Sequence, residues 1–341
     1  MQVQDIEASP PSLAESNLFA SQTPYNERFC SGVLAETAFS LVQEAGNVIY
    51  LAHPQAPMQT SIFSVDVEDW FHILDDPGVP TIDQWASLPS RVESNFSKLL
   101  DLFSEKNVQV TCFFLGWVAE RFPHLVKEAA NRGHEVASHG YGHRLVYEQS
   151  RTDFYEDVRG ARLLLEDISG VEVVGYRAPG FSTTDETPWF FDALAEAGYQ
   201  YDSSVFPAQR GHGGMPQSRR EPHRMGEHDV LLEIPITVTA LLGKPMCFFG
   251  GGYLRLAPYW LIRKMAQQVL GEGRPVVFYI HPREIDPAHP RLPMSRIRRF
   301  KSYVNLETTE VKLRRILQDF PVTTFKNVLS NYPQLANTHV A

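Results

Sequence analysis

Short apolar runs along the chain alternate with longer stretches in which apolar residues recur every three or four positions. The runs at 61–66, 108–115 and 275–280 are rich in β-branched and aromatic residues, which predicts strands. In the last of these the apolar residues are continuous, a pattern typical of a strand covered on both faces. Strands that alternate with helices in this way predict a parallel sheet.

The longer stretches carry the signals with which helices begin and end. The segment Ser90-Arg91-Val92-Glu93 predicts a capping box, and apolar residues follow it on one helix face. Ser150 and Asp153 predict the start of another helix, and Gly170 predicts its end. Further helices are expected to begin at Pro123, Thr187 and Pro258.

Length and composition fit one large α/β core. With 341 residues, 43% of them hydrophobic, the chain can hold a barrel of about 250 residues together with extensions. We expect an N-terminal extension at 1–57, a body at 58–286 and a C-terminal extension at 287–341. The alternation of strand and helix predicts that the body is a barrel or a barrel-like closure of the sheet.

Charge and cysteine content restrict the class of partner and the compartment. The formal charge of −9 argues against nucleic acid as a partner, because phosphates require a basic face. Three cysteines at unrelated spacings fit a reducing compartment better than a disulfide framework. The first residues do not resemble a secretory signal, and no run reaches the roughly twenty apolar residues of a membrane span. These features predict a soluble, cytoplasmic protein.

Polar residues with catalytic potential follow several of the predicted strands. In parallel α/β folds the reactive groups collect at the carboxyl ends of strands, so these residues are expected to meet. They are Asp66, Glu68, Asp69, His139, His143, Arg177, Gly180, Asp202 and His281.

A site for a divalent metal is the chemistry that this set favours. The glycines between His139 and His143 argue against a regular helix, so both rings are expected on one tight turn. One carboxylate and two imidazoles form a three-ligand site with an open position, as a water-activating ion requires. Asp66 and Glu68 lie two residues apart on one side of an extended segment, so one could bind metal while the other accepts a proton.

The same residues also have interpretations without chemistry. Segment 66–69 could be a turn, Arg177 an ordinary ion-pairing residue and His281 a satisfied strand-end histidine. The basic cluster at 296–301 is typical of a solvated face, with contact to phosphate or membrane as the weaker alternative. Two other functions stay open: a non-haem iron oxygenase, which also uses two histidines and a carboxylate, and a saccharide-binding protein without catalysis.

The order of these motifs resembles that of the polysaccharide deacetylases, carbohydrate esterases that share the NodB homology domain. The resemblance runs from about residue 61 to 285 and comprises an acid cluster, His-x-x-x-His, Arg-x-Pro, Asp-Ser-Ser and a hydrophobic-x-His motif. The first motif, 65–70, and the tail segment 300–306 are similar to the subgroup associated with bacterial exopolysaccharide and exosortase loci.

This resemblance implies a fold, a reaction and a cofactor. The family has a distorted (β/α) barrel and hydrolyses N-acetyl, sometimes O-acetyl, groups of an acetylated glycan. It uses one divalent metal, usually Zn²⁺. By motif, His139 and His143 would bind the metal, Asp66 would be the general base and His281 the general acid.

Three further roles follow from the resemblance. Arg177 would orient Asp66 and hold it ionised. Gly180 would offer a backbone N–H to the oxyanion. Asp202 would tune His281.

The third metal ligand stays open between two acids. The usual motif has two consecutive aspartates, whereas here Val67 intervenes before Glu68, and Asp69 follows. We favour Glu68, because it lies on the same side of the segment as Asp66.

Overall fold

The structure, a computed structural model, describes residues 43–44, 47–48, 60–74, 76–211 and 213–331. Contacts divide the chain into two compact units, 1–55 and 56–341. The described residues of the first unit form an antiparallel pair, β1 (Gln43–Glu44) and β2 (Asn47–Val48). Most of the predicted extension 1–57 thus lies outside the described residues. The expected boundary after residue 286 stays a prediction.

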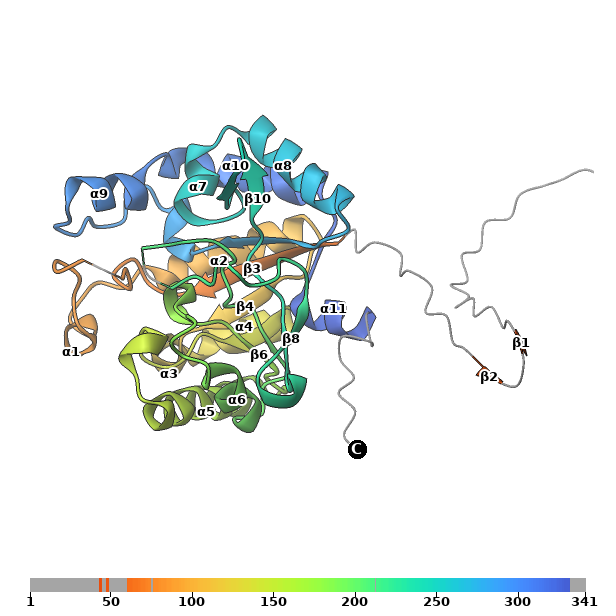
Figure 1. Ribbon diagram of the computed structural model, residues 1–341. Helices are drawn as coiled ribbons and strands as arrows, with labels where there is room; N and C mark the ends of the chain where they lie inside the picture. Colours follow the sequence, from red (N-terminus) through yellow and green to blue (C-terminus); the bar gives the residue numbers. More distant parts are fainter. Residues whose placement is uncertain (1–42, 45–46, 49–59, 75, 212, 332–341) are drawn as a thin grey trace, which may run out of the picture. The chain divides into compact units, whose positions relative to one another are not determined.

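The second unit is built on one sheet, with the strand order β12-β3-β4-β5-β6-β7-β9-β8 and β13 paired to β3. All neighbouring pairs are parallel except β8 with β9. Among the described residues the end strands β12 and β8 do not pair, so the sheet is a curled, open form of the barrel (Figure 1). The predicted distorted (β/α) barrel is confirmed. The strands are β3 (Ser61–Val67), β4 (Thr111–Phe114), β5 (Glu135–Ser138), β6 (Gly175–Tyr176), β7 (Tyr201–Asp202), β8 (His223–Met225), β9 (Leu231–Glu233), β12 (Val276–Ile280) and β13 (Val322–Thr323), and a separate hairpin joins β10 (Thr239–Leu241) and β11 (Lys244–Met246).

Helices connect the strands and cover the sheet. In Figure 1, α7 and α8 lie above the strands, whereas α3, α5 and α6 lie below them. None of the helices among the described residues has the length and apolar character needed to cross a lipid bilayer. The helices are α1 (Ile82–Trp85), α2 (Val92–Glu105), α3 (Gly116–Arg121), α4 (Pro123–Asn131), α5 (Arg151–Ser169), α6 (Phe190–Glu196), α7 (Gly251–Leu256), α8 (Tyr259–Gly271), α9 (Arg296–Tyr303), α10 (Thr309–Asp319) and α11 (Phe325–Asn331).

The local signals at helix ends predict α5 well and α2 only in part. The Ser150 side chain accepts a hydrogen bond from the Asp153 backbone N–H, and Gly170 ends α5 at φ 70°. At α2 the predicted capping box is wrong, because the helix begins after Arg91 without a side-chain bond from that residue. The cap comes instead from Asp69, which is distant in sequence.

Alternation along β3 decides which side chains reach the site. Phe63 and Val65 pack into one buried apolar cluster, and Ile62 packs into the other. Successive side chains of a strand point to opposite faces, so Asp66 lies on the same face as Ile62. Strand β12 pairs with β3, β3 with β4, and β4 with β5, and all three pairs are parallel. The carboxyl ends of these four strands therefore lie at one edge of the sheet. The predicted site residues therefore meet there.

Candidate metal centre and active site

Glu68, His139 and His143 bring three potential metal ligands together. One donor atom from each lies within 4.8 Å of the others, and all three side chains are buried. Glu68 follows β3 and the histidines follow β5, with β4 between these strands. Gly140 turns the chain at φ 72° between the histidines, in agreement with the expected tight turn.

Hydrogen bonding and charge prepare these groups for a cation. His139 Nδ1 donates to the Arg177 carbonyl oxygen at 2.8 Å, which leaves Nε2 as the atom available to a metal. Burial lowers the pKa of His139 to about 4, so the ring is neutral at pH 7. Burial alone would raise the pKa of Glu68, but the neighbouring imidazoles, His143 foremost, outweigh this effect and lower it. The result is an ionised carboxylate beside a neutral imidazole.

One buried atom of Glu68 has no hydrogen-bond partner among the described residues. Its Oε2 lies 2.7 Å from His143 Nε2, but the two groups do not have hydrogen-bond geometry. A buried polar atom left unpaired costs about 1–3 kcal/mol. A cation coordinated by both atoms would satisfy both.

Asp69, the alternative third ligand, binds the start of α2 instead of lying beside the histidines. Its carboxylate accepts hydrogen bonds from the Ser90 hydroxyl and from the backbone N–H groups of Arg91 and Val92. A negative charge at the start of a helix is favourable there, so Asp69 ties α2 to the end of β3. Of the two acids, the structure places Glu68 beside the histidines.

Asp66 is held in place by a buried ion pair. Arg177 Nη1 lies 2.7 Å from Asp66 Oδ1, and the Arg177 residue is 0% exposed. The guanidinium also donates to Ser64 Oγ at 2.8 Å and lies 4.1 Å from the centre of the Phe113 ring. Arg177 is thus an ion-pairing residue, and its partner is the predicted base.

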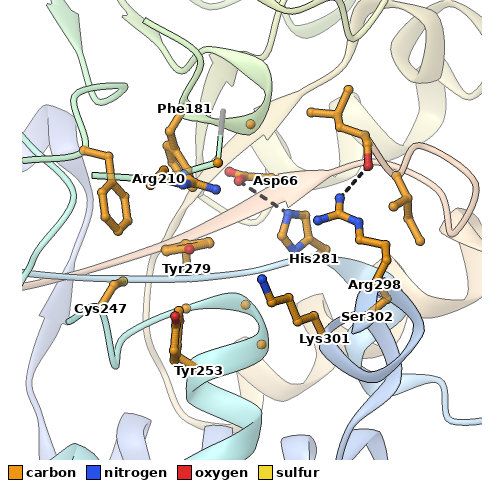
Figure 2. Close-up of a pocket in the computed structure, with 18 of the residues that line it drawn as sticks. Asp66, Phe181, Arg210, Cys247, Tyr253, Tyr279, His281, Arg298, Lys301 and Ser302 are labelled. Atoms are coloured by element: carbon orange, nitrogen blue, oxygen red, sulfur yellow. Dashed lines mark hydrogen bonds and ion pairs between the residues drawn. The ribbon is translucent and has the colours of Figure 1, made fainter. Parts of the chain in front are cut away.

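His281 faces Asp66 in the cavity (Figure 2). Its Nε2 lies 3.8 Å from Asp66 Oδ2 and 3.4 Å from Glu68 Oε1. Its Nδ1 donates to Glu284 Oε1 at 2.6 Å. Burial would lower the pKa of His281, but the charges of Glu68 and Glu284 outweigh it and raise the pKa.

Glu284 is a site residue that the sequence analysis missed. It is fully buried, and its carboxylate pairs with Arg255 as well as with His281. Arg255 in turn donates to the backbone carbonyls of Lys301 and Val304, so the C-terminal extension supports this carboxylate. Its spacing three residues after His281 was an available signal, because such side chains meet on a helical turn. Nothing in the sequence pointed to Arg255.

Asp202 does not lie where its predicted role requires. Its carboxylate accepts hydrogen bonds from the Oγ and backbone N–H of Ser204, and Glu284 occupies the expected position beside His281. Strands β3 to β6 separate β7, which carries Asp202, from β12, which precedes His281. Ser204 Oγ also accepts from the backbone N–H of Ala178. Asp202 therefore supports the turn after β6 rather than the histidine.

The site opens into a cavity of about 860 Å³. Asp66, Glu68, both metal-site histidines and His281 line one part of it, and Gly180, at φ 64°, lines it as well. Aromatic side chains form much of the remaining wall, namely Tyr147, Phe181, Phe206, Tyr253, Tyr279 and Phe300. A cavity of this size and lining suits a small organic ligand such as one or a few sugar rings.

Two family descriptions match the chain. The first, polysaccharide deacetylase, matches residues 80–201, which include His139, His143, Arg177 and Gly180. The second, a domain of unknown function (DUF3473), matches residues 203–330, which include His281.

Curated relatives match short parts of the chain. A peptidoglycan-N-acetylglucosamine deacetylase of Bacillus cereus is 32% identical over 82 residues, which is 24% of this chain and 30% of the relative. A second protein with that name from the same organism is 29% identical over 103 residues, 30% of this chain and 46% of the relative. The matches thus span less than half of each relative.

Solved structures share the fold. A putative polysaccharide deacetylase from Mycobacterium smegmatis has a TM-score of 0.59 at 19% identity, covering 84% of this chain and 94% of that one. An allantoinase (Puue) has a TM-score of 0.56 at 15% identity, covering 85% and 96%. Because the second protein is named an allantoinase and both are under 25% identical, these similarities show the fold and not the activity. The resemblance found in the motifs is nevertheless confirmed by the family match, because residues 80–201 match the polysaccharide deacetylase family.

Proposed function

We propose that the protein is a metal-dependent hydrolase that removes N-acetyl groups from a polysaccharide or its glycan precursor. The observation that carries this proposal is the meeting of three potential metal ligands with a buried acid and a histidine in one cavity. The family match supports the reaction class. The names of the Bacillus cereus relatives support an acetylated glycan as the substrate. The first motif and the tail segment, which resemble the exopolysaccharide-associated subgroup, favour an exopolysaccharide or its precursor.

Glu68, His139 and His143 would hold the metal, which we propose to be Zn²⁺. Two imidazoles and one carboxylate suit this ion, and three protein ligands leave a position for water or substrate. The unpaired Oε2 of Glu68 fits this assignment, because a cation would complete its environment. When bound, the metal would polarise the acetyl carbonyl and make a water molecule more acidic.

Asp66 would take the proton from the attacking water. The buried Arg177 pairs with this carboxylate at 2.7 Å and would fix its orientation. A general base must be both ionised and within reach of the proton that it removes.

His281 would give a proton to the leaving amine, since an amide nitrogen departs poorly without one. Glu284 would hold the ring with Nε2 toward the substrate and favour its charged form. The backbone N–H of Gly180 would donate to the developing oxyanion, a contact that stabilises the transition state.

Replacing Asp66 with Asn tests the assignment of the base. Turnover should fall by about 10² to 10⁴-fold, because the proton acceptor is lost while the shape is kept. Acetate release from a panel of N-acetylated glycans measures this, and metal content should match the wild type. Equal hydrolysis of acetylated chito-oligomers by both proteins would contradict the assignment.

Metal removal tests the reaction class. Chelation should abolish acetate release from the same panel, and added Zn²⁺ should restore it. Sugar binding in calorimetry without any acetate release would support the saccharide-binding alternative. Iron in the purified protein together with oxygen-dependent turnover would support the alternative of a non-haem iron oxygenase. That alternative gives no role to the pair Asp66 and His281.

A further inference from the structure

Exposed apolar side chains gather at the mouth of the cavity. Four of the residues that line it are 48%, 48%, 72% and 56% exposed, namely Tyr253 and Leu256 of α7 and Ile297 and Phe300 of α9. The members of each pair are three residues apart, so they lie on one side of their helix. Side chains that line a cavity and are also exposed lie at its opening. Large apolar side chains gathered in this way mark a binding surface.

Helices α7 and α9 are joined by a buried arginine. The Arg255 guanidinium, on α7, donates to the backbone carbonyls of Lys301 and Ser302 on α9. Arg255 also pairs with the buried Glu284, which fixes it from behind. The two helices therefore present one surface. It is here called the rim face and comprises Tyr253, Leu256, Arg296, Ile297, Arg299, Phe300 and Lys301.

Positive charge flanks the apolar residues of the rim face. On α9, Arg296 lies four residues before Phe300, and Lys301 lies four residues after Ile297, so each cation adjoins an apolar side chain. Arg296, Arg299 and Lys301 are exposed, and none of them forms an ion pair with a residue that the structure describes. Helices α7, α8 and α9 contain no aspartate or glutamate. In a chain with 40 acidic residues and a formal charge of −9, this region is distinctly basic.

The acids that contact α7 and the start of α9 have partners other than the rim-face cations. Glu284 is buried and pairs with Arg255. Asp76 accepts a hydrogen bond from the backbone N–H of Ser295, just before α9. Arg298 is only partly exposed and donates to a backbone carbonyl, so it is not counted in the rim face. The charge of the rim face therefore comes from three exposed side chains.

We propose that the rim face docks the protein on an anionic lipid bilayer, with the mouth of the cavity toward the membrane. Apolar and aromatic side chains enter the boundary between lipid headgroups and acyl chains, and arginine and lysine beside them contact anionic headgroups. The rim face offers both kinds of side chain on neighbouring positions. An acidic polysaccharide would match the cations, but it would leave the aliphatic Leu256 and Ile297 without an apolar partner.

Membrane docking goes beyond the proposed function and has a consequence for it. A cavity that opens toward a bilayer most directly receives a substrate attached to the membrane. Together with the proposed deacetylation, on which this step rests, docking favours a glycan precursor carried on a membrane lipid.

Co-sedimentation of the full chain with lipid vesicles tests the docking. Vesicles of phosphatidylglycerol and phosphatidylcholine in equal parts should bind the protein, and vesicles of phosphatidylcholine alone should bind it much more weakly. Arg296→Gln combined with Arg299→Gln should weaken binding to the anionic vesicles by about 10- to 30-fold, because each cation near the surface contributes a factor of about 5. Added salt should weaken binding of the wild type as well.

Ile297→Ser combined with Phe300→Ser tests the apolar contribution. Binding should fall by about 10-fold or more, because two large side chains no longer leave water. Leu163→Ser is the matched apolar control, since Leu163 is 45% exposed on α5, on the other side of the sheet (Figure 1). Arg159→Gln combined with Lys127→Gln is the matched charge control, because both residues are exposed outside the rim face. The controls should bind vesicles as the wild type does, and thermal unfolding should show that all variants are folded.

Equal binding to neutral and anionic vesicles, absence of vesicle binding, or wild-type binding by the two rim-face variants overturns the proposal. If soluble hyaluronan binds through Arg296 and Arg299 while vesicles do not, the rim face belongs to an acidic glycan instead. Vesicle binding needs no turnover, so failure to release acetate would contradict the proposed function and leave the docking test valid.

Discussion

At the scale of single residues, the site depends on buried charges that each have a specific partner. Arg177 has no exposed surface and pairs with Asp66, while Glu284 pairs with both Arg255 and His281. Removing one partner of a buried pair leaves the other charge uncompensated, which costs about 3–5 kcal/mol. Conservative substitutions are therefore the informative ones here.

Glu284→Gln tests whether this carboxylate positions His281. Glutamine keeps the size of the side chain but removes the charge that favours protonation of the ring. We expect kcat to fall by about 10- to 100-fold with a smaller change in KM, as for other partners of catalytic histidines. Metal content should be unchanged, because Glu284 is not among the proposed ligands. The exposed Glu307→Gln is the control, and a wild-type kcat in Glu284→Gln would contradict this role.

The residues of the site could be predicted from the sequence only in part. The ordered motifs predicted that Asp66, His139, His143 and His281 would meet, because the carboxyl ends of parallel strands share one edge. Spacing favoured Glu68 over Asp69 as the neighbour of the histidines, but it could not show that Asp69 caps α2, because that contact joins segments distant in the chain.

At the scale of elements, the segment after β3 contributes both to the candidate metal site and to the start of α2. Glu68 turns toward β5, and Asp69 turns toward the start of α2. Neighbouring positions thus serve the site and the scaffold.

Alanine substitutions of Glu68 and Asp69, made one at a time, test whether the first residue binds metal and the second caps α2. Asp69→Ala should lower the free energy of unfolding by about 1–3 kcal/mol, because the N–H groups at the start of α2 lose their acceptor, and metal content should persist. Glu68→Ala should lose the metal and keep the helix cap. Metal analysis and denaturant unfolding of both variants measure this. Loss of metal in Asp69→Ala but not in Glu68→Ala would make Asp69 the ligand.

Short elements were the least predictable from sequence. Strand β8 lies in a segment rich in Gly, Arg, His and Pro, yet it pairs with β9. Strands β6 and β7 have two residues each, too few for any periodicity to appear. Such strands exist because a neighbouring strand supplies hydrogen-bond partners, which is information from outside the segment.

At the scale of the whole molecule, the C-terminal extension is part of the core. Strand β13 pairs with β3, and the buried residues Leu313, Ile316 and Phe325 belong to the two apolar clusters of the second unit. The backbone around Lys301 also holds Arg255, which holds Glu284. The extension thus supports both the sheet and the site.

A chain that ends at residue 286 should therefore fail to fold. Each large apolar side chain buried from the extension contributes about 1.5–3 kcal/mol, and together they approach the total stability of a typical protein, about 5–15 kcal/mol. Circular dichroism and thermal unfolding would show the loss. As a graded variant, Leu313→Ala in the full chain should cost about 2–5 kcal/mol. Cooperative unfolding of the shortened chain near the wild-type midpoint would contradict this prediction.

The sequence by itself predicted the alternation of strand and helix and the meeting of Asp66, His139, His143 and His281 at one edge of the sheet. These features are local, since periodicity and motif order are properties of short segments. Tertiary structure alone decided that Asp69 caps α2 and that Glu284 rather than Asp202 holds His281. Each of these outcomes depends on contacts between segments distant in the chain, and such contacts form only when the sheet closes around the site.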